Sequence, residues 1–564
     1  MTKKDDKTTV SPAGETSRRT MLKGTAGAAS VVAAAGLTGA QARGWGHGHP
    51  PSNGHPILAE RKPLRTARSI KTRFDAAADQ RFSDLPKQET NGDDAYPDRR
   101  ASFTKTLPHN AFGEVDTAAY DELLKALGSR DQNDFEAITL APGAQRKLAN
   151  PQGAYKLEMT GLDSNLTWMR PAPTFTGLET AAEMGELYWK ARCRDVPFAR
   201  YETSNRIANA AADLNGFSET VGPKDGGMVT PGTIFRGETP GDLVGPYISQ
   251  LLYKPIPFGN SVLEQRYVTP ARGDDYMTNF GEWLAVQNGT APAPLVKSNP
   301  RYISDARALG EYVHVDFSYQ AYQSAALILL GIPGSLDDGN LYKTSATQGA
   351  FVSLGGPDVL DLVAKAGNLA LTGAWYQKWL VHRRLRPEVY GARLTQQMLG
   401  NRDYELPDEI TDSRAVRGTV RRNGNALLPM AFPEGSPTHP SYPAGHATIA
   451  GACCTVLKAF FNEEMEIPSP VEPNNSGSAL LPYGGSLTIG GEINKLANNI
   501  SLGRDWAGVH YRSDGVDGLF VGEQQAIQML KDYSRTYNET FGGFTLTKYD
   551  GTRININDGS VTPA

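Results

Sequence analysis

The segment PSYPAGHATIAG (residues 440–451) passes from a proline-rich turn into an apolar helical run, with a glycine and a histidine at the transition. Gly445 lets the backbone approach a ligand closely because glycine has no side chain. Free N–H groups at the start of the helix would point at an anion, assisted by the helix dipole. Ala444, directly before them, offers no hydroxyl donor. The segment therefore predicts either an anion site that lacks one donor or the start of an ordinary helix.

Two further segments concentrate basic residues. KWLVHRRLRP (residues 378–387) places Lys378 and Arg386 about two helical turns apart, which predicts that they share one face of a helix that Pro387 ends. SLGRDWAGVHYRSD (residues 501–514) places Arg504 and His510 on either side of a glycine-containing bend. An oxyanion needs such a set: cations to neutralise charge, bidentate donors, and histidines that bond covalently or move a proton.

Each segment alone also has an ordinary interpretation. Two lysines or arginines on one helix face commonly form a solvated basic surface, and a single histidine at a helix start is commonly structural. The order and spacing of all three segments favour one oxyanion site within residues 378–514.

Helical periodicity dominates the chain from residue 180 onward. TAAEMGELYWKARCR (residues 180–194) repeats apolar residues at intervals of three and four, and similar patterns cover residues 206–214, 305–330, 361–385, 446–461, 493–502 and 517–533. Strand signals are few. The clearest is FTLTKYDGTRINI (residues 544–556), where Asp550 and Gly551 would turn a hairpin. We expect a mainly α protein with long loops, such as residues 255–273 and 400–442, and a small C-terminal β-hairpin.

The first 42 residues have the parts of a twin-arginine export signal in the right order. Arg18 and Arg19 precede a small-residue apolar stretch over residues 24–40, and Ala40-Gln41-Ala42 supplies a cleavage site. The alternative is an incidental basic N-terminus. We expect export to the periplasm or the extracellular space.

Residues 43–110 are rich in Gly, Pro, His and Arg, which predicts a flexible extension before a main body over residues 111–564. His47, His49 and His55 could bind a metal weakly. A flexible tail is favoured because no cysteine or carboxylate cluster accompanies them.

Composition excludes several classes of protein. A chain of 564 residues exceeds the usual single domain, which favours two domains or one large helical body. The formal net charge of −4 argues against a nucleic-acid partner, and no later apolar run approaches the roughly 18 residues of a membrane span. Cys193, Cys453 and Cys454 are too few for a disulfide framework, and the apolar run around the last two predicts buried thiols.

The motif order K-x7-R-P, P-A-G-H and R-x5-H-x3-D resembles the signature of vanadium-dependent haloperoxidases and the type 2 phosphatidic acid phosphatase superfamily. GPYISQLLYKPIPFG, EYVHVDFSYQAYQSAALILLGIP and EGSPTHPSYPAGHATIAGA are similar to the algal and bacterial bromoperoxidase branch. This resemblance covers about residue 180 to the C-terminus. It implies a helical fold of two four-helix bundles that holds vanadate in a deep cleft.

The resemblance also implies roles for individual residues. His510 would be the axial ligand, bonded to vanadium through a ring nitrogen. Lys378, Arg386 and Arg504 would bind the equatorial oxygens, and the Gly445 N–H would donate to another.

Three further side chains have implied roles. His446 would be the acid/base near the axial hydroxide, and His439 would influence halide selectivity or proton delivery. Asp316 would orient Arg504.

The implied chemistry is peroxide activation without an organic cofactor. Vanadium in the +5 state would act as a Lewis acid toward hydrogen peroxide. A halide would then be oxidised to hypohalous acid, which halogenates an organic acceptor. Lys378 would polarise the peroxide oxygen that the halide attacks. Bromide is favoured over iodide or chloride by the resemblance around His439, and a homo-oligomer is expected.

Ala444 departs from the family, which usually has Ser there as a donor to an equatorial vanadate oxygen. Losing one charge-assisted hydrogen bond should cost about 1.5–3 kcal/mol, which predicts weaker vanadate retention in a working site. Two alternatives share the same pocket. One is an exported acid phosphatase with His510 as nucleophile and His446 protonating the leaving alcohol. The other is a non-catalytic oxyanion-binding protein.

Overall fold

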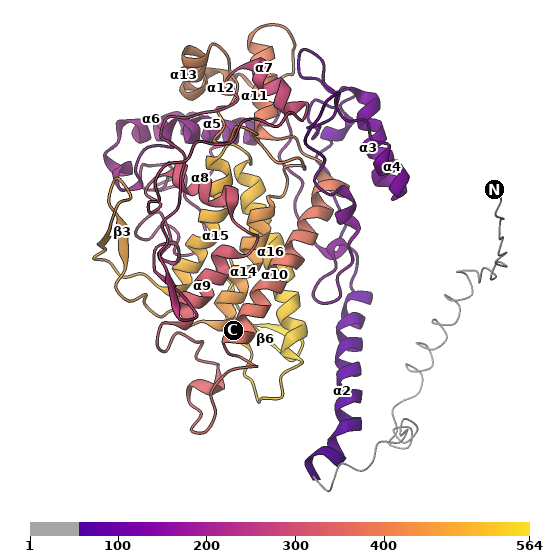
Figure 1. Ribbon diagram of the computed structural model, residues 1–564, viewed down its shortest axis with the longest axis vertical. Helices are drawn as coiled ribbons and strands as arrows, with labels where there is room; N and C mark the ends of the chain where they lie inside the picture. Colours follow the sequence, from indigo (N-terminus) through magenta and orange to yellow (C-terminus); the bar gives the residue numbers. More distant parts are fainter. Residues whose placement is uncertain (1–55) are drawn as a thin grey trace, which may run out of the picture. The chain divides into compact units, whose positions relative to one another are not determined.

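The computed structural model describes the backbone of residues 56–564 and the side chains from residue 64 onward (Figure 1). The chain divides into two units, residues 1–75 and 76–564. Of the first unit, the structure describes only the beginning of helix α2 (Pro56–Arg81). The predicted export signal over residues 1–42 and His47, His49 and His55 lie outside the described residues. All that follows concerns the second unit.

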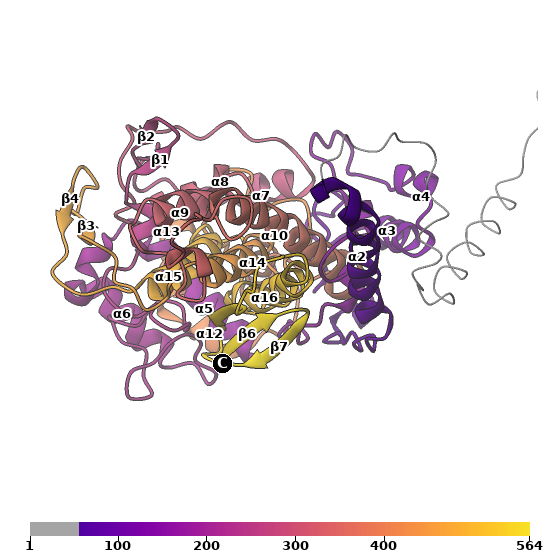
Figure 2. The same ribbon diagram turned by 90° about the horizontal axis from the view of Figure 1, so that it is seen from below.

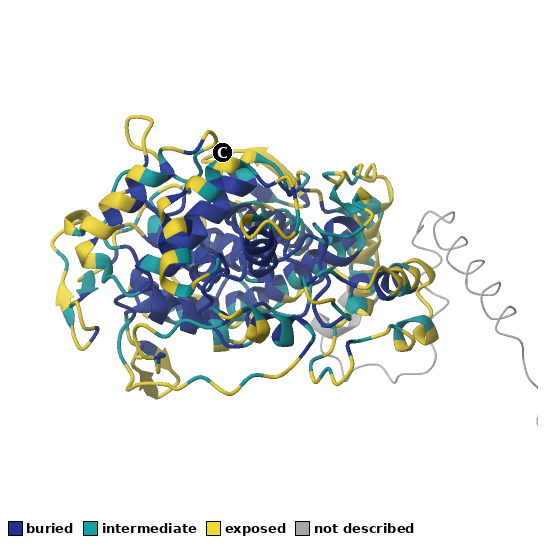
Figure 3. Ribbon diagram, turned by 90° about the horizontal axis from the view of Figure 1, so that it is seen from above, coloured by how far each residue is buried: buried dark blue, intermediate teal, exposed yellow. Residues whose placement is uncertain are grey.

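Four long helices lie side by side at the centre of this unit (Figures 1 and 2). They are α10 (Gly356–Tyr376), α14 (Gly445–Phe460), α15 (Ile489–Trp506) and α16 (Arg512–Ser534). Glycines let α14 and α16 approach closely: a Cβ on Gly522 would lie 2.0 Å from the Thr448 carbonyl oxygen, and one on Gly451 would lie 2.1 Å from that of Leu519. Nearly every residue of α14 and α15 is buried, and the middle of the unit is its buried core (Figure 3). The mainly helical fold class is thereby confirmed.

The remaining helices surround this bundle. Helix α8 packs on α15, and α9 packs on α10 and α14. The surrounding helices are α3 (Thr117–Ser129), α4 (Gln132–Glu136), α5 (Leu178–Cys193), α6 (Asn205–Leu214), α7 (Phe280–Gln287), α8 (Ala306–Val315), α9 (Gln320–Leu330), α11 (Pro387–Met398), α12 (Asp408–Asp412) and α13 (Arg414–Asn423). Short 3₁₀ turns are η2 (Asp93–Ala95), η3 (Pro151–Tyr155), η4 (Ser164–Leu166), η5 (Phe198–Thr203), η6 (Gln250–Leu252) and η7 (Leu341–Lys343).

Two predictions about helices were wrong, and both concern segments that build the site. Residues 305–330 form two helices, because the backbone is extended at Asp316, where α8 ends. The helix that carries Lys378 ends in a π-helical turn, η8 (Gln377–His382), and Arg383 then adopts a left-handed conformation with φ of 41°. Arg386 is the N-cap of α11, so Pro387 begins a helix rather than ending one, as suits its fixed φ. Lys378 and Arg386 therefore do not share one helix face.

The strands form three small antiparallel sheets. They are β1 (Ile256–Phe258) with β2 (Ser261–Leu263), β3 (Val471–Pro473) with β4 (Leu480–Pro482), and β5 (Phe544–Thr547), β6 (Arg553–Asn557) and β7 (Ser560–Pro563). The predicted C-terminal hairpin is confirmed, with Gly551 at a φ of 83° in its turn, and β7 extends it to three strands beside α16 (Figure 2). The predicted loops over residues 255–273 and 400–442 contain the β1–β2 hairpin and helices α12 and α13. No helix in the described range is long and apolar enough to cross a membrane.

The structure also differs from the flexible extension predicted over residues 43–110. Residues 101–107 are buried, and Phe103 and Leu107 belong to a hydrophobic cluster with Trp379. The buried Lys105 ammonium lies 2.7 Å from the Glu388 carboxylate on α11. These contacts make the end of this stretch part of the folded body. Cys453 and Cys454 are buried free thiols, as predicted, and so is Cys193.

Candidate active site

Three buried cations converge beneath the start of α14. Lys378 Nζ, on the π-helical turn η8, donates to the carbonyls of Pro440 and Ser441 at 2.7 and 2.8 Å. Arg386 donates through Nε to the His439 carbonyl at 3.0 Å. The two side chains therefore meet at neighbouring carbonyls of the turn before α14, although they come from different elements. A π-helical turn is often associated with a functional site.

Arg504, near the end of α15, completes the set. Its Nη1 donates to the Val313 carbonyl, 2.6 Å away at the end of α8, and its guanidinium lies 5.8 Å from the Phe432 ring centroid. Its Nε is buried and has no hydrogen-bond partner among the described residues. Among the described residues, no carboxylate forms an ion pair with Lys378, Arg386 or Arg504.

The electrostatic state of the site follows from this excess of positive charge. Burial, reinforced by the charges of Arg386 and Arg504, holds the pKa of Lys378 well below its ordinary value. Burial lowers the pKa of Arg386 to about 9, and it lowers that of Arg504 to about 10 although the Asp316 charge opposes it. An anion placed among these cations would relieve their repulsion, so the site is suited to a ligand of negative charge.

The two ring nitrogens of His510 contact different partners, Arg386 and the carboxylate of Asp514. Its Nδ1 donates to Asp514 Oδ2 at 2.8 Å, and its Nε2 lone pair accepts from Arg386 Nη1 at 2.9 Å. Burial and the charges of Arg386 and Lys378 hold the pKa of His510 well below its ordinary value. The imidazole is therefore neutral with its lone pair on Nε2, which is the form that binds a metal.

Asp514 is held by a network of its own. Its Oδ1 accepts from Arg384 Nη1 at 2.8 Å, and its Oδ2 accepts from the Ser441 hydroxyl and from the Tyr511 N–H. Arg384 also donates to Glu183 at 3.0 Å and stacks 3.8 Å from the Tyr511 ring centroid. This network fixes the carboxylate that orients His510.

The other two histidines lie on either side of the turn. His439 Nδ1 accepts from Arg386 Nη2 at 3.0 Å, and its ring lies 4.7 Å from that of Trp375. Burial and the charges of Lys378 and Arg386 hold the pKa of His439 well below its ordinary value. His446, half-buried at the start of α14, contacts Asp316 through Nε2 at 2.9 Å. The prediction that Asp316 orients Arg504 needs correction, because its carboxylate bonds to His446 and acts on Arg504 only through its charge.

The first turn of α14 leaves three N–H groups open. Ala444 is the buried N-cap without a side-chain cap, and its N–H donates to the Asp514 carbonyl at 2.8 Å. The N–H groups of Gly445, His446 and Ala447 have no partner in the described part of the chain. A Cβ on Gly445 would meet only ordinary contacts, 3.6 Å from Leu371 and farther from Trp375, so packing does not require glycine here. Close approach of a ligand to the backbone would require it.

Comparison with known proteins shows the family of this chain. Residues 362–539 match a family model described as the VCPO second helical-bundle domain. A vanadium-dependent bromoperoxidase of Ascophyllum nodosum is 36% identical over 493 residues, which cover 82% of this chain and 88% of that protein. The chain belongs to the vanadium-dependent bromoperoxidase family. A second family member, from Corallina pilulifera, is 33% identical over 551 residues, which cover 82% of this chain and 92% of that protein.

The family fold is shared over nearly the whole chain. A homohexameric structure of the second vanadate-dependent bromoperoxidase from Ascophyllum nodosum superposes with a TM-score of 0.85 at 29% identity, covering 94% of this chain and 98% of that one. The family resemblance drawn from the motifs is thereby confirmed. For this bromoperoxidase-family chain, the structure gathers Lys378, Arg386, Gly445, His446, Arg504, His510 and His439 around one turn, with Ala444 beside them. Their individual roles stay predictions.

The sequence did not reveal the residues that hold the candidate ligand-binding side chains in place. Asp514 is the last residue of the R-x5-H-x3-D motif, and its spacing from His510 could have indicated a helical i, i+4 contact. Arg384 lies between the two basic residues that were singled out, in the run HRRLR. Ser441 and Trp375 carry no local signal, since their partners are distant in sequence.

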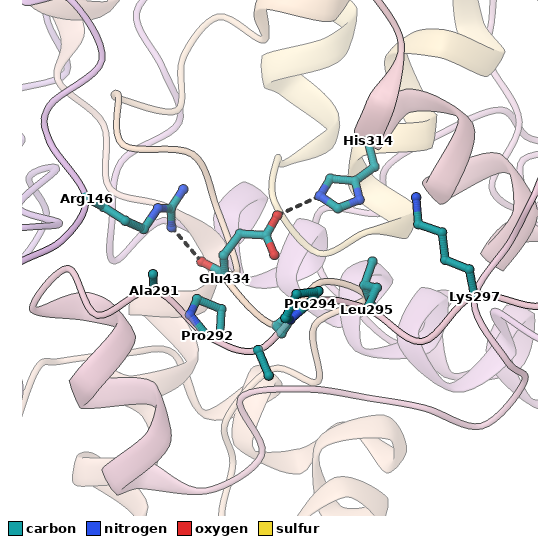
Figure 4. A pocket seen from close by; sticks show the side chains of 10 residues that line it. Arg146, Ala291, Pro292, Pro294, Leu295, Lys297, His314 and Glu434 are labelled. Carbon is teal, nitrogen blue, oxygen red and sulfur yellow. Dashed lines mark hydrogen bonds and ion pairs between the residues drawn. The ribbon is translucent and has the colours of Figure 1, made fainter.

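Beside Arg504 lies a pocket of about 490 Å³, lined by Arg146, Lys297, His314, Glu434 and the apolar residues Ala291, Pro292, Ala293, Pro294, Leu295 and Pro433 (Figure 4). His314 stacks on Phe432 with ring centroids 3.8 Å apart and bonds Glu311 and Glu434 through its two nitrogens. Phe432 also lies 5.8 Å from the Arg504 guanidinium, so this ring contacts both His314 of the pocket wall and a cation of the basic site.

Proposed function

We propose that this chain is a vanadate-dependent haloperoxidase that oxidises bromide with hydrogen peroxide to hypobromous acid. Bromide, hydrogen peroxide and one proton give hypobromous acid and water, and the acid then brominates an organic acceptor. The observation that carries the proposal is the buried cluster of Lys378, Arg386 and Arg504 around His510, in which none of the three cations pairs with a carboxylate of the described residues.

The residues present fit vanadate. Arg504 Nε, the open N–H groups at the start of α14 and the cations of Lys378 and Arg386 would receive its oxygens, and His510 Nε2 would bond the vanadium. When bound, vanadium in the +5 state supplies Lewis acidity that makes peroxide oxygen electrophilic without a change of metal oxidation state.

Side chains of the protein itself orient the histidine ligand, supply positive charge and move a proton. Asp514 keeps the proton of His510 on Nδ1 and the lone pair on Nε2, where Arg386 now donates and where vanadium would take the place of that hydrogen bond. Lys378 is fixed by two carbonyls and brings positive charge to oxygen atoms that become more negative during the reaction. His446 is held by Asp316 through Nε2, so its Nδ1 is the nitrogen left to accept or deliver a proton.

The choice of bromide rests on the relatives, which are named bromoperoxidases, and on His439 beside Arg386. We further propose that the protein assembles as a homo-oligomer, because the structurally similar relative is homohexameric. Export by the twin-arginine route rests on the sequence of residues 1–42 alone.

A paired assay tests the proposal. Purified protein freed of vanadate and phosphate is titrated with vanadate while bromination of monochlorodimedone is followed with bromide and hydrogen peroxide. The vanadate-free protein is assayed in parallel for hydrolysis of p-nitrophenyl phosphate. Saturable activation of bromination by vanadate is expected. Phosphate-ester hydrolysis that vanadate inhibits, without any bromination, would assign the site to a phosphatase instead.

A further inference from the structure

The pocket beside Arg504 has the dimensions of a small-molecule site. Its volume of about 490 Å³ falls within the range of 300–1,000 Å³ usual for such sites, enough for a ligand with one aromatic ring. One wall is the segment Ala-Pro-Ala-Pro-Leu over residues 291–295, which offers an apolar surface (Figure 4). Charged side chains stand around this surface, with Arg146 at one end and Lys297 at the other.

Most of the charged groups around the pocket already have partners. Lys297 pairs with the buried carboxylate of Glu311 at 2.7 Å, and His314 lies between Glu311 and Glu434 at 3.1 and 2.6 Å. Burial opposes the His314 charge, but its hydrogen bonds to the two glutamates raise its pKa above the ordinary value. The acidic groups that line or adjoin the pocket are therefore already engaged.

Among the described residues, Arg146 has no carboxylate within ion-pairing distance, although its charge acts on the Glu434 carboxylate. Its Nη1 donates to the backbone carbonyl of Glu434 at 3.0 Å, and in the described part of the chain it forms no ion pair. The side chain is half-buried, so its guanidinium is fixed at one edge while the remaining N–H groups can face a ligand. A guanidinium in this state binds a carboxylate through two parallel hydrogen bonds.

The pocket also adjoins the proposed reaction site. The carbonyl that holds Arg504 belongs to Val313, the residue before His314 in the pocket wall. Phe432, stacked on His314, precedes Glu434 by two residues and lies beneath the Arg504 guanidinium. Glu434 acts on Arg504 through its charge. An acceptor in the pocket would thus lie near His314, whose ring stacks on the aromatic residue next to Arg504.

We propose that this pocket binds the organic acceptor as an electron-rich aromatic carboxylate, with its carboxylate on Arg146 and its ring against Pro292, Pro294 and Leu295. This inference rests on the proposed function, which supplies the oxidant. In the step itself, a ring carbon attacks the bromine of hypobromous acid and a carbon–bromine bond forms. The oxygen–bromine bond breaks, and the proton lost from the same carbon leaves with the hydroxide as water.

Binding is tested first, without the reaction. The vanadate-free protein is titrated by calorimetry with 4-hydroxyphenylacetate and with its neutral analogue 4-hydroxyphenylacetamide. The acid is expected to bind at least tenfold more tightly, as one charge-assisted contact would give. Arg146→Gln should remove this preference and Arg146→Lys should keep part of it. Arg414→Gln, which removes an exposed arginine with a side chain 66% accessible, should change nothing.

The reaction is tested second, in the vanadate-loaded protein. Arg146→Gln should lower kcat/KM for bromination of the acid about tenfold or more while bromination of the amide stays within twofold. Equal binding of acid and amide, or an unchanged preference in Arg146→Gln, would overturn the pocket assignment. Selective binding of the acid without any bromination would support the pocket and refute the proposed function, so the two failures are distinguishable.

Discussion

The substitution Ala444→Ser restores the one donor that the basic site lacks. Ala444 is the buried N-cap of α14, directly before the three open N–H groups, and its own N–H is already bonded to the Asp514 carbonyl. A serine hydroxyl at this position can donate its proton toward the bound oxyanion while its lone pair accepts an N–H from the first helical turn.

Both contributions have expected sizes. One hydrogen bond to a charged group contributes about 1.5–3 kcal/mol, which is roughly 10- to 100-fold in vanadate affinity. The new N-cap should add about 1 kcal/mol to the stability of the vanadate-free protein. An ordered water in the site of the missing hydroxyl would reduce the gain in affinity, since a bridging water makes similar hydrogen bonds.

Calorimetric titration of phosphate-free protein with vanadate measures the first effect, and urea unfolding without vanadate measures the second. Ala444→Gly is the control, because it changes the side chain without adding a donor, and its affinity should stay within twofold of the unsubstituted protein. If Ala444→Ser tightens vanadate binding by less than about twofold, the position does not face the oxyanion and the reasoning is refuted.

Three further predictions concern stability. Asp514→Asn removes the charge that holds His510 and Arg384, and it should cost about 3–5 kcal/mol in urea unfolding of the vanadate-free protein; a loss below 1 kcal/mol would contradict the network. Gly522→Ala forces a Cβ against α14 and should cost about 1–3 kcal/mol or more, whereas Gly484→Ala, in open space, should be nearly neutral in the same experiment. The pKa of His314 is raised in the folded state, so the stability it contributes is present below its ordinary pKa of 6.5 and is lost as pH rises through the raised value. Thermal unfolding of His314→Asn should therefore differ from the unsubstituted protein more at pH 6 than at pH 9, and an equal difference at both would rule out the charged pair with Glu434.

Local patterns were enough to predict the helices whose apolar faces repeat regularly, such as α5, α6 and α16. They failed where a helix is short of apolar residues. RAVRGTVRRN forms α13, but its buried face is limited to small residues such as Ala415, Val416 and Thr419, and its arginines resemble a loop surface. A loop was predicted there because a polar sequence has too few apolar residues to show helical periodicity.

The chemistry of the site was predictable, but its construction was not. Lys378 and Arg386 do bind the same turn, but not because they share a helix face, as was expected. The helix ends between them, and each side chain reaches a carbonyl of residues 439–441 from its own element. Asp316 and His446 are 130 positions apart, and only the fold brings them into contact. Such tertiary pairings leave no periodicity for a single sequence to reveal.

The most direct test of the central claim is the vanadium content of the protein after equilibrium dialysis against vanadate, measured for the unsubstituted chain and for His510→Ala. The account predicts one vanadium for each chain in the first and at least a tenfold weaker retention in the second, with the fold of both verified by circular dichroism. Equal vanadium in both proteins would contradict it, because His510 would then not be the residue that holds the metal.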